Sequence, residues 1–293
     1  MINSKIFLIA STLLFGYCPE GTSQSDLLNH NQKENNMEII ETQLPHKDLK
    51  QIYFLQFDND LSNLKSGENF NLAFSPRPKH DEKLVVELET IHEKKAHIII
   101  VSEDLEYFSH IHPDNENNGE YSVKIKLPFG GKYSLFIEYK PKGSDKIVDH
   151  FNLFSEGKEK SKVVFKSERY LFEDQDISAQ LRPAEDLLSG KEIHIPVAIL
   201  KDGKELNAAN FDNYLGEKAH AVLIGITNFD FLHVHPMVIN NQLNLHMNLV
   251  ESGYYRLWLQ FQVDGILHTA DFVLETKPSN QLNEKINHNQ HKH

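Results

Sequence analysis

Residues 95–113 read KAHIIIVSEDLEYFSHIHP, and residues 218–236 read KAHAVLIGITNFDFLHVHP. In each stretch a histidine opens an apolar run, a turn follows, and the next run ends in His-x-His-Pro. Short runs rich in β-branched and aromatic residues, bounded by turn residues, predict β-strands. The recurrence of the whole pattern predicts that one strand-rich domain occurs twice in the chain.

The duplication extends beyond these two stretches. A shift of 123 places lays Lys95 on Lys218 and Phe108 on Phe231. With two single-residue gaps the match continues through the glycine and aromatic positions Gly131/Gly253, Tyr133/Tyr255, Leu135/Leu257 and Phe151/Phe272. Short strands with regular turns indicate antiparallel sandwiches and not alternating strands and helices. We therefore predict an all-β fold of two tandem immunoglobulin-like antiparallel β-sandwich domains that arose by internal duplication.

The composition of the chain divides it into six segments. A polar stretch rich in Asn, Gln and Glu separates the N-terminus from the first strands, and the charged stretch EGKEKSK separates the two repeats. Such stretches mark linkers. We expect a signal peptide at 1–23, a linker at 24–46, the first β-sandwich domain at 47–155, a linker at 156–162, the second β-sandwich domain at 163–276, and a disordered histidine-containing tail at 277–293.

The N-terminus predicts export. An apolar run at 6–16 follows Lys5 and is far shorter than the roughly 20 residues that span a bilayer, which is typical of a secretory signal peptide. Cys18 stands where a lipoprotein cysteine would stand, but Phe15-Gly16-Tyr17 is a poor lipobox, and cleavage nearer Ser23 is the alternative. No later segment is long enough to cross a membrane. We expect an extracytoplasmic protein, periplasmic or secreted, with or without a lipid anchor.

Charge and cysteine content narrow the function. The 293 residues include 30 Lys+Arg and 42 Asp+Glu, a net charge of -12, which argues against a nucleic-acid surface. The single cysteine excludes an intramolecular disulfide framework, a cysteine zinc ribbon and an iron–sulfur site. The sequence has no phosphate-binding loop and no Gly-x-Ser-x-Gly nucleophile elbow, and we expect no enzymatic activity.

Six of the 17 histidines fall at matched positions of the two repeats. Residues i and i+2 of a strand share a face, so the two rings of each His-x-His can point the same way. A hairpin centred near Glu103-Asp104 or Asp104-Leu105 would place His110 or His112 opposite His97. Three rings would then converge, whereas a register shifted by one residue would send His97 to the other face.

Three neutral imidazoles are a suitable ligand set for Zn(II), Cu(II) or Ni(II). We predict one tri-histidine metal site per domain, made of His97, His110 and His112 in the first domain and His220, His233 and His235 in the second. His92 is a candidate fourth contact in the first domain. Two other interpretations stay open: structural histidines in an adhesion or scaffold module that binds through a sandwich edge, and a metal-dependent hydrolase. The unmatched His150, His246 and His268 are interpreted as structural.

At these residues the chain resembles a group of secreted bacterial proteins with YtkA-like, immunoglobulin-like β-sandwich domains. The resemblance covers about 49–274 and rests on the SEDL turn, HIHP and GGKYSLF of the first half and on the YLG, HVHP and GYYRLWLQF of the second. It implies a sandwich fold, an extracytoplasmic location and an association with copper or heavy-metal handling. The predicted function is exported copper or zinc binding for metal buffering or delivery, with a metal ion or another extracytoplasmic protein as partner.

Overall fold

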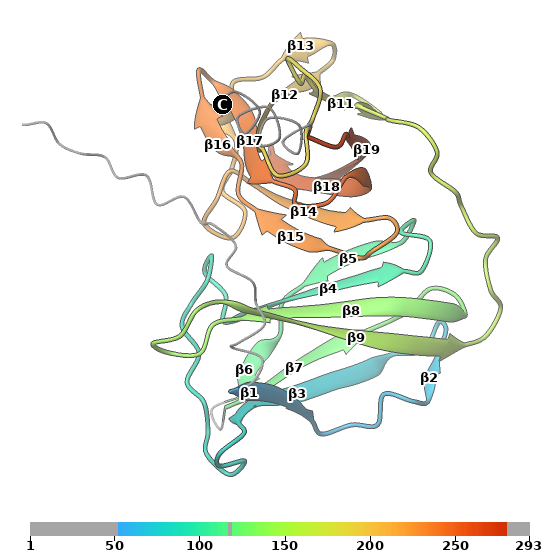
Figure 1. The fold of residues 1–293 in the computed structure, drawn as a ribbon, viewed down its shortest axis with the longest axis vertical. Helices are drawn as coiled ribbons and strands as arrows, with labels where there is room; N and C mark the ends of the chain where they lie inside the picture. The colour runs from blue at the N-terminus through green and yellow to red at the C-terminus, as the bar shows by residue number, and fades with distance from the viewer. Residues whose placement is uncertain (1–51, 117–118, 280–293) are drawn as a thin grey trace, which may run out of the picture. The chain divides into compact units, whose positions relative to one another are not determined.

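The computed structural model describes residues 52–116 and 119–279, which form two β-sandwich domains (Figure 1). The first domain has two sheets. One has the strand order β1-β3-β7-β6, with β1 at Tyr53–Phe57, β3 at Phe70–Pro78, β7 at Glu120–Ile125 and β6 at Asp114–Glu116. The other has the order β2-β9-β8-β4-β5, with β2 at Leu64–Lys65, β9 at Ile147–Glu156, β8 at Gly131–Tyr139, β4 at Ala96–Ser102 and β5 at Phe108–Ile111.

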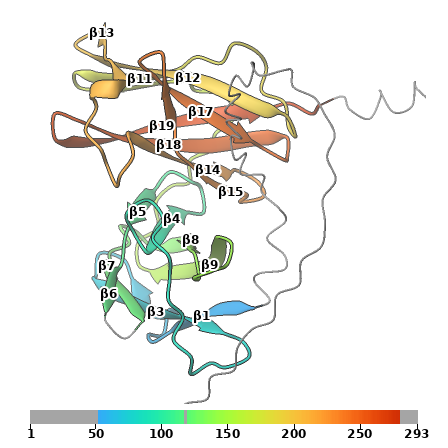
Figure 2. The same cartoon turned by 90° about the vertical axis from the view of Figure 1, so that its left-hand side faces the viewer.

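The second domain repeats this arrangement. Its first sheet has the order β10-β11-β12-β17-β16, with β10 at Leu171–Asp174, β11 at Ile177–Leu181, β12 at Glu192–Lys201, β17 at Gln242–Asn248 and β16 at Met237–Ile239, and β13 at Lys204–Glu205 pairs with β12. Its second sheet has the order β15-β14-β18-β19, with β15 at Phe231–Val234, β14 at Ala219–Gly225, β18 at Gly253–Val263 and β19 at Ile266–Thr276. In Figure 2 β11 and β12 form a layer over β18 and β19.

The predicted fold class is confirmed: the protein is an all-β tandem of two sandwich-like domains. Among the described strands, every pair is antiparallel except β2 with β9. The described residues contain one short 3-10 helix, Ala208–Asn210, and no α-helix. Within the same residues no helix is long and apolar enough to cross a membrane.

Strands β4 and β14 are buried on both faces. Ile98 and Ile100 of β4 point into the core of the first domain. The alternate residues Ile99 and Val101 belong instead to a separate apolar cluster that draws on both domains. Its buried members are Ile99, Val101, Leu105, Phe136, Val222, Ile224 and Trp258. The outer faces of the sheets that carry the histidine hairpins therefore pack against each other, which explains why residues 98–101 of β4 and 221–224 of β14 are apolar at consecutive positions.

Contacts between the two domains come in matched pairs. Phe108 stacks on Trp258 with ring centroids 4.6 Å apart, and Phe231 stacks on Phe136 at 4.8 Å. Phe108 and Phe231 are equivalent positions of β5 and β15, and Phe136 and Trp258 are equivalent positions of β8 and β18. The domains thus use the same patch reciprocally, as the subunits of a two-fold symmetric dimer do.

Replacing Trp258 by alanine should destabilise the protein strongly. Trp258 is 2% exposed and stacks across the domain contact, and the loss of a buried tryptophan typically costs about 3–5 kcal/mol. In chemical denaturation the variant should reach its unfolding midpoint at a lower denaturant concentration than the wild-type protein. Phe154→Ala is the matched control, because Phe154 is 51% exposed and should tolerate truncation. Equal midpoints for the two variants would contradict the assigned packing.

Candidate metal centre

The histidine hairpins adopt one of the two registers that the sequence allows. Strands β4 and β5 pair Ile98 with Ile111 and Val101 with Phe108, which centres the hairpin between residues 104 and 105. One position beyond the pair Ile98–Ile111, the same register places His112 opposite His97. Strands β14 and β15 pair Ala221 with Val234, which sets His235 opposite His220 in the same way. His97 and His220 share the outer face of their strands with the apolar residues of the domain contact.

A tight turn before each hairpin fixes one ring. The Nε2–H group of His97 donates to the carbonyl oxygen of Ile91 at 3.0 Å, and the Nε2–H group of His220 donates to that of Tyr214 at 2.8 Å. Two left-handed residues follow each carbonyl: His92 and Glu93 (φ 48° and 63°) in one turn, Leu215 and Gly216 (φ 52° and 84°) in the other. Because Nε2 carries the hydrogen, Nδ1 of each neutral ring presents a lone pair to its neighbours.

In the first domain three nitrogens converge. Nδ1 of His97 lies 3.1 Å from Nε2 of His110, and Nε2 of His112 lies 3.1 Å and 3.2 Å from these two atoms. The far nitrogen of His110, Nδ1, lies 2.8 Å from Oε1 of Gln260, whose own Nε2 donates to Thr269. Nδ1 of His110 is therefore the donor, and its Nε2, like Nδ1 of His97, has only a lone pair to offer.

The second domain repeats the arrangement. Nδ1 of His220 lies 3.0 Å from Nε2 of His235 and 3.4 Å from Nε2 of His233. The far nitrogen of His233 donates to Oε2 of Glu138 at 2.7 Å. We call His97, His110 and His112 the first trio, and His220, His233 and His235 the second trio.

The two trios lie next to each other. The ring centroid of His233 is 5.2 Å from that of His97 and 5.3 Å from that of His110. Two groups of ligand nitrogens are each mutually within 4.8 Å, and His233 belongs to both: one with His97 and His110, the other with His220 and His235. The repeat in the sequence predicted two separate sites, one in each domain. The two trios are adjacent because the domains pack together, and no pattern among the histidines indicated this packing.

Burial keeps four of these rings neutral, those of His97, His110, His112 and His220. His97, His110, His220 and His233 are at most 8% exposed. Burial, followed by the charges of neighbouring histidines, lowers the pKa of His97 to about 4 and that of His220 to about 3. The same causes lower the pKa of His112 to about 3 and depress the pKa of His110. Neutral imidazole is the form that ligates metal, so the clusters could hold an ion at neutral pH.

The two domains exchange supporting groups. Gln260 of the second domain accepts from His110, and Glu138 of the first domain accepts from His233. Glu138 pairs with His97 across β8 and β4, and Gln260 pairs with His220 across β18 and β14, so the two supports occupy equivalent positions. Neither residue was singled out in the sequence. Their alignment in the duplication is the signal that could have identified them.

Glu138 is a buried charge with two partners. It is 1% exposed, and its Oε1 lies 3.1 Å from Nζ of Lys146 while its Oε2 accepts from His233. Burial on its own would raise the pKa of this carboxyl, but His233 and Lys146 hold the pKa well below its ordinary value. The cluster is therefore flanked by one ionised carboxylate, on the side of the second trio.

His92 lies against the second trio, not the first as the sequence suggested. Its ring centroid is 3.5 Å from that of His235 but 6.2 Å from that of His97. The turn that holds His92 also contacts the equivalent turn of the other domain, since a Cβ on Gly216 would lie 3.0 Å from Cγ of Glu93. His92 lies beside the second trio because the two domains pack together, and this packing was not predicted from the sequence.

Other described histidines form a third cluster or stack on phenylalanine rings. Glu192, His194 and His246 form a third cluster on β12 and β17, with Nε2 of His246 2.5 Å from Oε1 of Glu192, but two of the three are exposed. His150 stacks on Phe136 at 4.4 Å, and His268 stacks on Phe261 at 5.4 Å. The signal peptide, Cys18 and the tail histidines His288, His291 and His293 lie outside the described residues.

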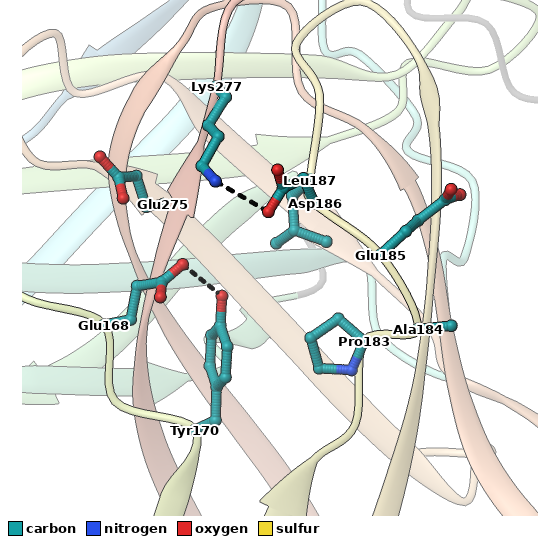
Figure 3. Close-up of a pocket in the computed structure, with 9 residues that line it drawn as sticks. All are labelled: Glu168, Tyr170, Pro183, Ala184, Glu185, Asp186, Leu187, Glu275 and Lys277. Carbon is teal, nitrogen blue, oxygen red and sulfur yellow. Dashed lines mark hydrogen bonds and ion pairs between the residues drawn. The ribbon is translucent and has the colours of Figure 1, made fainter.

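A pocket on the second domain is unconnected with the trios. It is lined by Glu168, Tyr170, Pro183, Ala184, Glu185, Asp186, Leu187, Glu275 and Lys277 (Figure 3). Four of its polar side chains are already paired, because Lys277 contacts Asp186 at 2.8 Å and Tyr170 donates to Glu168 at 2.6 Å. No histidine lines it. The histidine cluster is the stronger candidate for a functional site.

These features define a tandem β-sandwich protein with a histidine cluster where its two domains meet. Residues 53–153 and 173–278 match the model of a family described as a domain of unknown function (DUF8832). The match covers more than half of the chain, and the protein belongs to this family, whose domain it contains twice.

Other comparisons add little. No curated protein matches the chain. Among solved structures, trypsin-activated alpha-2-macroglobulin from Escherichia coli is 10% identical with a TM-score of 0.25, over 77% of this chain and 16% of that chain. The BSP domain of a biofilm associated protein is 12% identical with a TM-score of 0.22, over 77% of this chain and 30% of that chain. The protein thus spans less than a third of either chain.

The metal-free protein should lose stability as the pH falls below about 6.5. Unfolded histidine titrates near pH 6.5, whereas burial lowers the pKa of His97 to about 4 and that of His220 to about 3 in the folded chain. Between these values the unfolded chain binds protons that the folded chain excludes. The free energy of unfolding should therefore fall by about 1.4 kcal/mol per pH unit for each such ring.

Urea denaturation of the chelator-treated protein at about pH 7.5, 6 and 5 measures this slope. His220→Gln is the informative variant, because glutamine can still donate to the carbonyl of Tyr214 but does not titrate. Its slope should be shallower than that of the wild-type protein by the contribution of one ring. An identical slope in both proteins would show that His220 is not a buried neutral ring.

Proposed function

We propose that this protein binds divalent transition-metal ions, Cu(II) or Zn(II), through the convergent nitrogens of the two trios. The observation that carries the proposal is the close approach of two bare nitrogens, Nδ1 of His97 and Nε2 of His110, at 3.1 Å. Each of these rings already donates its single hydrogen elsewhere, to Ile91 and to Gln260. Two lone pairs that face each other repel unless a hydrogen or a cation lies between them.

The dimensions of the first trio suit such an ion. Nitrogens separated by 3.1 Å, 3.1 Å and 3.2 Å are equidistant from a point about 1.8 Å away in their plane. A metal at the usual distance of about 2.0–2.1 Å from imidazole nitrogen would lie about 1 Å outside that plane. Three ligands on one side leave a further coordination position for water or a fourth group.

The surroundings of the rings favour metal ligation over a purely structural role. Ligating histidines almost always donate their other ring N–H group to a carbonyl, a carboxylate or a similar acceptor, which fixes the tautomer. Four of the six rings do so here, through Ile91, Tyr214, Gln260 and Glu138. A histidine with only a structural role would not need its second nitrogen aimed at two other rings.

We infer that the role is buffering or delivery of the metal outside the cytoplasm, without catalysis. The apolar, signal-like run at 6–16 supports export. We also propose that the His-x-His-Pro hairpins relate the protein to YtkA-like domains. In the alternative function, an adhesion or scaffold module, β16 would supply the binding edge, since Met237, Val238 and Ile239 are 37–43% exposed on an edge strand.

Isothermal titration of the chelator-treated protein with Cu(II) or Zn(II) tests the proposal. The wild-type protein should bind, and the His110→Ala/His233→Ala variant should bind more than about 100-fold more weakly, because losing a ligand exceeds the 10–100-fold effect of losing a supporting group. His112→Ala/His235→Ala serves as a second variant, since these two half-buried rings lie beyond the ends of β5 and β15.

His194→Ala/His246→Ala is the matched control, because it also removes two histidines, here from the paired strands β12 and β17, but leaves both trios intact. It should bind metal at the trios as the wild-type protein does. Equal binding by the wild-type protein and the trio variants would refute the assigned ligands. Absence of binding in the wild-type protein would favour the adhesion or scaffold alternative.

A further inference from the structure

The two trios share a boundary that lies between the domains. The ligand nitrogens of His233, His97 and His110 all lie within 4.8 Å of one another. The same holds for the ligand nitrogens of His233, His220 and His235. The ring centroid of His110 is also 6.1 Å from that of His220. Two ions held by these trios would therefore be near neighbours and would interact through their charges.

Each trio depends on the opposite domain for one orienting group. The amide of Gln260 accepts from His110, and the carboxylate of Glu138 accepts from His233. A single domain therefore holds the three histidines of its trio but lacks the acceptor that orients one of them. The histidine cluster is thus one centre built by both domains together.

The two orienting groups differ in charge although they occupy equivalent positions. A carboxylate that accepts from the far nitrogen of a ligating imidazole raises the basicity of the ring and strengthens its bond to a metal. A neutral amide orients the ring with less electrostatic gain. Glu138 is moreover held from its other side by Lys146 at 3.1 Å, which keeps the carboxylate in place.

We propose that the six histidines form a single two-ion centre that fills in a fixed order, the second trio first. This inference rests on the proposed metal binding. The first ion enters the trio of His220, His233 and His235, where Glu138 compensates its charge. The second ion enters the trio of His97, His110 and His112 with lower affinity, because neither His97 nor His110 donates to a carboxylate and because the ion faces the charge of the first ion.

The loading order can be followed by calorimetric titration in a chain that lacks the histidines of the third cluster and of the tail. This background carries His194→Ala, His246→Ala, His288→Ala, His291→Ala and His293→Ala. It should bind two equivalents of Cu(II) in two steps of unequal affinity. His235→Ala should remove the tighter step and His112→Ala the weaker one, and chemical denaturation verifies that each variant is folded.

Glu138→Gln tests the cause of the order, because glutamine keeps the shape and can still accept from His233. It should weaken the tighter step about 10–100-fold and leave the weaker step nearly unchanged. Gln260→Glu is the converse, and in a folded variant it should strengthen the weaker step. If Glu138→Gln shifts neither step, or if His112→Ala removes the tighter step, the proposed order is wrong.

Electron paramagnetic resonance of Cu(II) tests the proximity of the two ions. One equivalent should give the spectrum of an isolated Cu(II) ion, and the second should broaden or diminish the signal through coupling between the two spins. Two equivalents that give two undisturbed spectra would overturn the single centre while leaving metal binding intact. A protein that binds no Cu(II) at all would instead overturn the proposed function.

Discussion

The hydrogen bond from His97 to the carbonyl of Ile91, which His220 repeats with Tyr214, decides what the cluster can do. An imidazole ring with one hydrogen has one nitrogen left over, and this bond determines that the leftover nitrogen faces the other rings. The carbonyl is correctly placed only because two left-handed residues turn the chain immediately after it. A local backbone feature thus sets the chemistry of a site formed by residues far along the sequence.

Burying four of the six imidazoles requires compensation, and the domain contact supplies part of it. Polar groups removed from water cost free energy unless they are hydrogen-bonded, and four of the rings donate to fixed acceptors. The stacked pairs Phe108–Trp258 and Phe136–Phe231 add apolar burial beside the cluster. The apolar contact and the histidine cluster are therefore mutually dependent parts of one interface.

Much of this arrangement could be predicted from the sequence, and the limits are physical. The repeat and its strand punctuation predicted the two sandwiches, and the alternation of residues along a strand predicted that each His-x-His shares a face. The packing between domains was missed, although the run IIIV of β4 is apolar at consecutive positions, which is typical of a strand covered on both sides. Glu138 is 95 residues from His233, and Gln260 is 150 residues from His110, so no local pattern could link them.

The reciprocal contact between the domains has a consequence for how such a centre can evolve. In a homodimer of a single domain, one codon would specify both orienting positions, and the two halves of the cluster would have to be identical. Covalent fusion of two copies removes this restriction, because each copy can then change on its own. The glutamate at position 138 and the glutamine at position 260 are a difference that a symmetric ancestor could not have had.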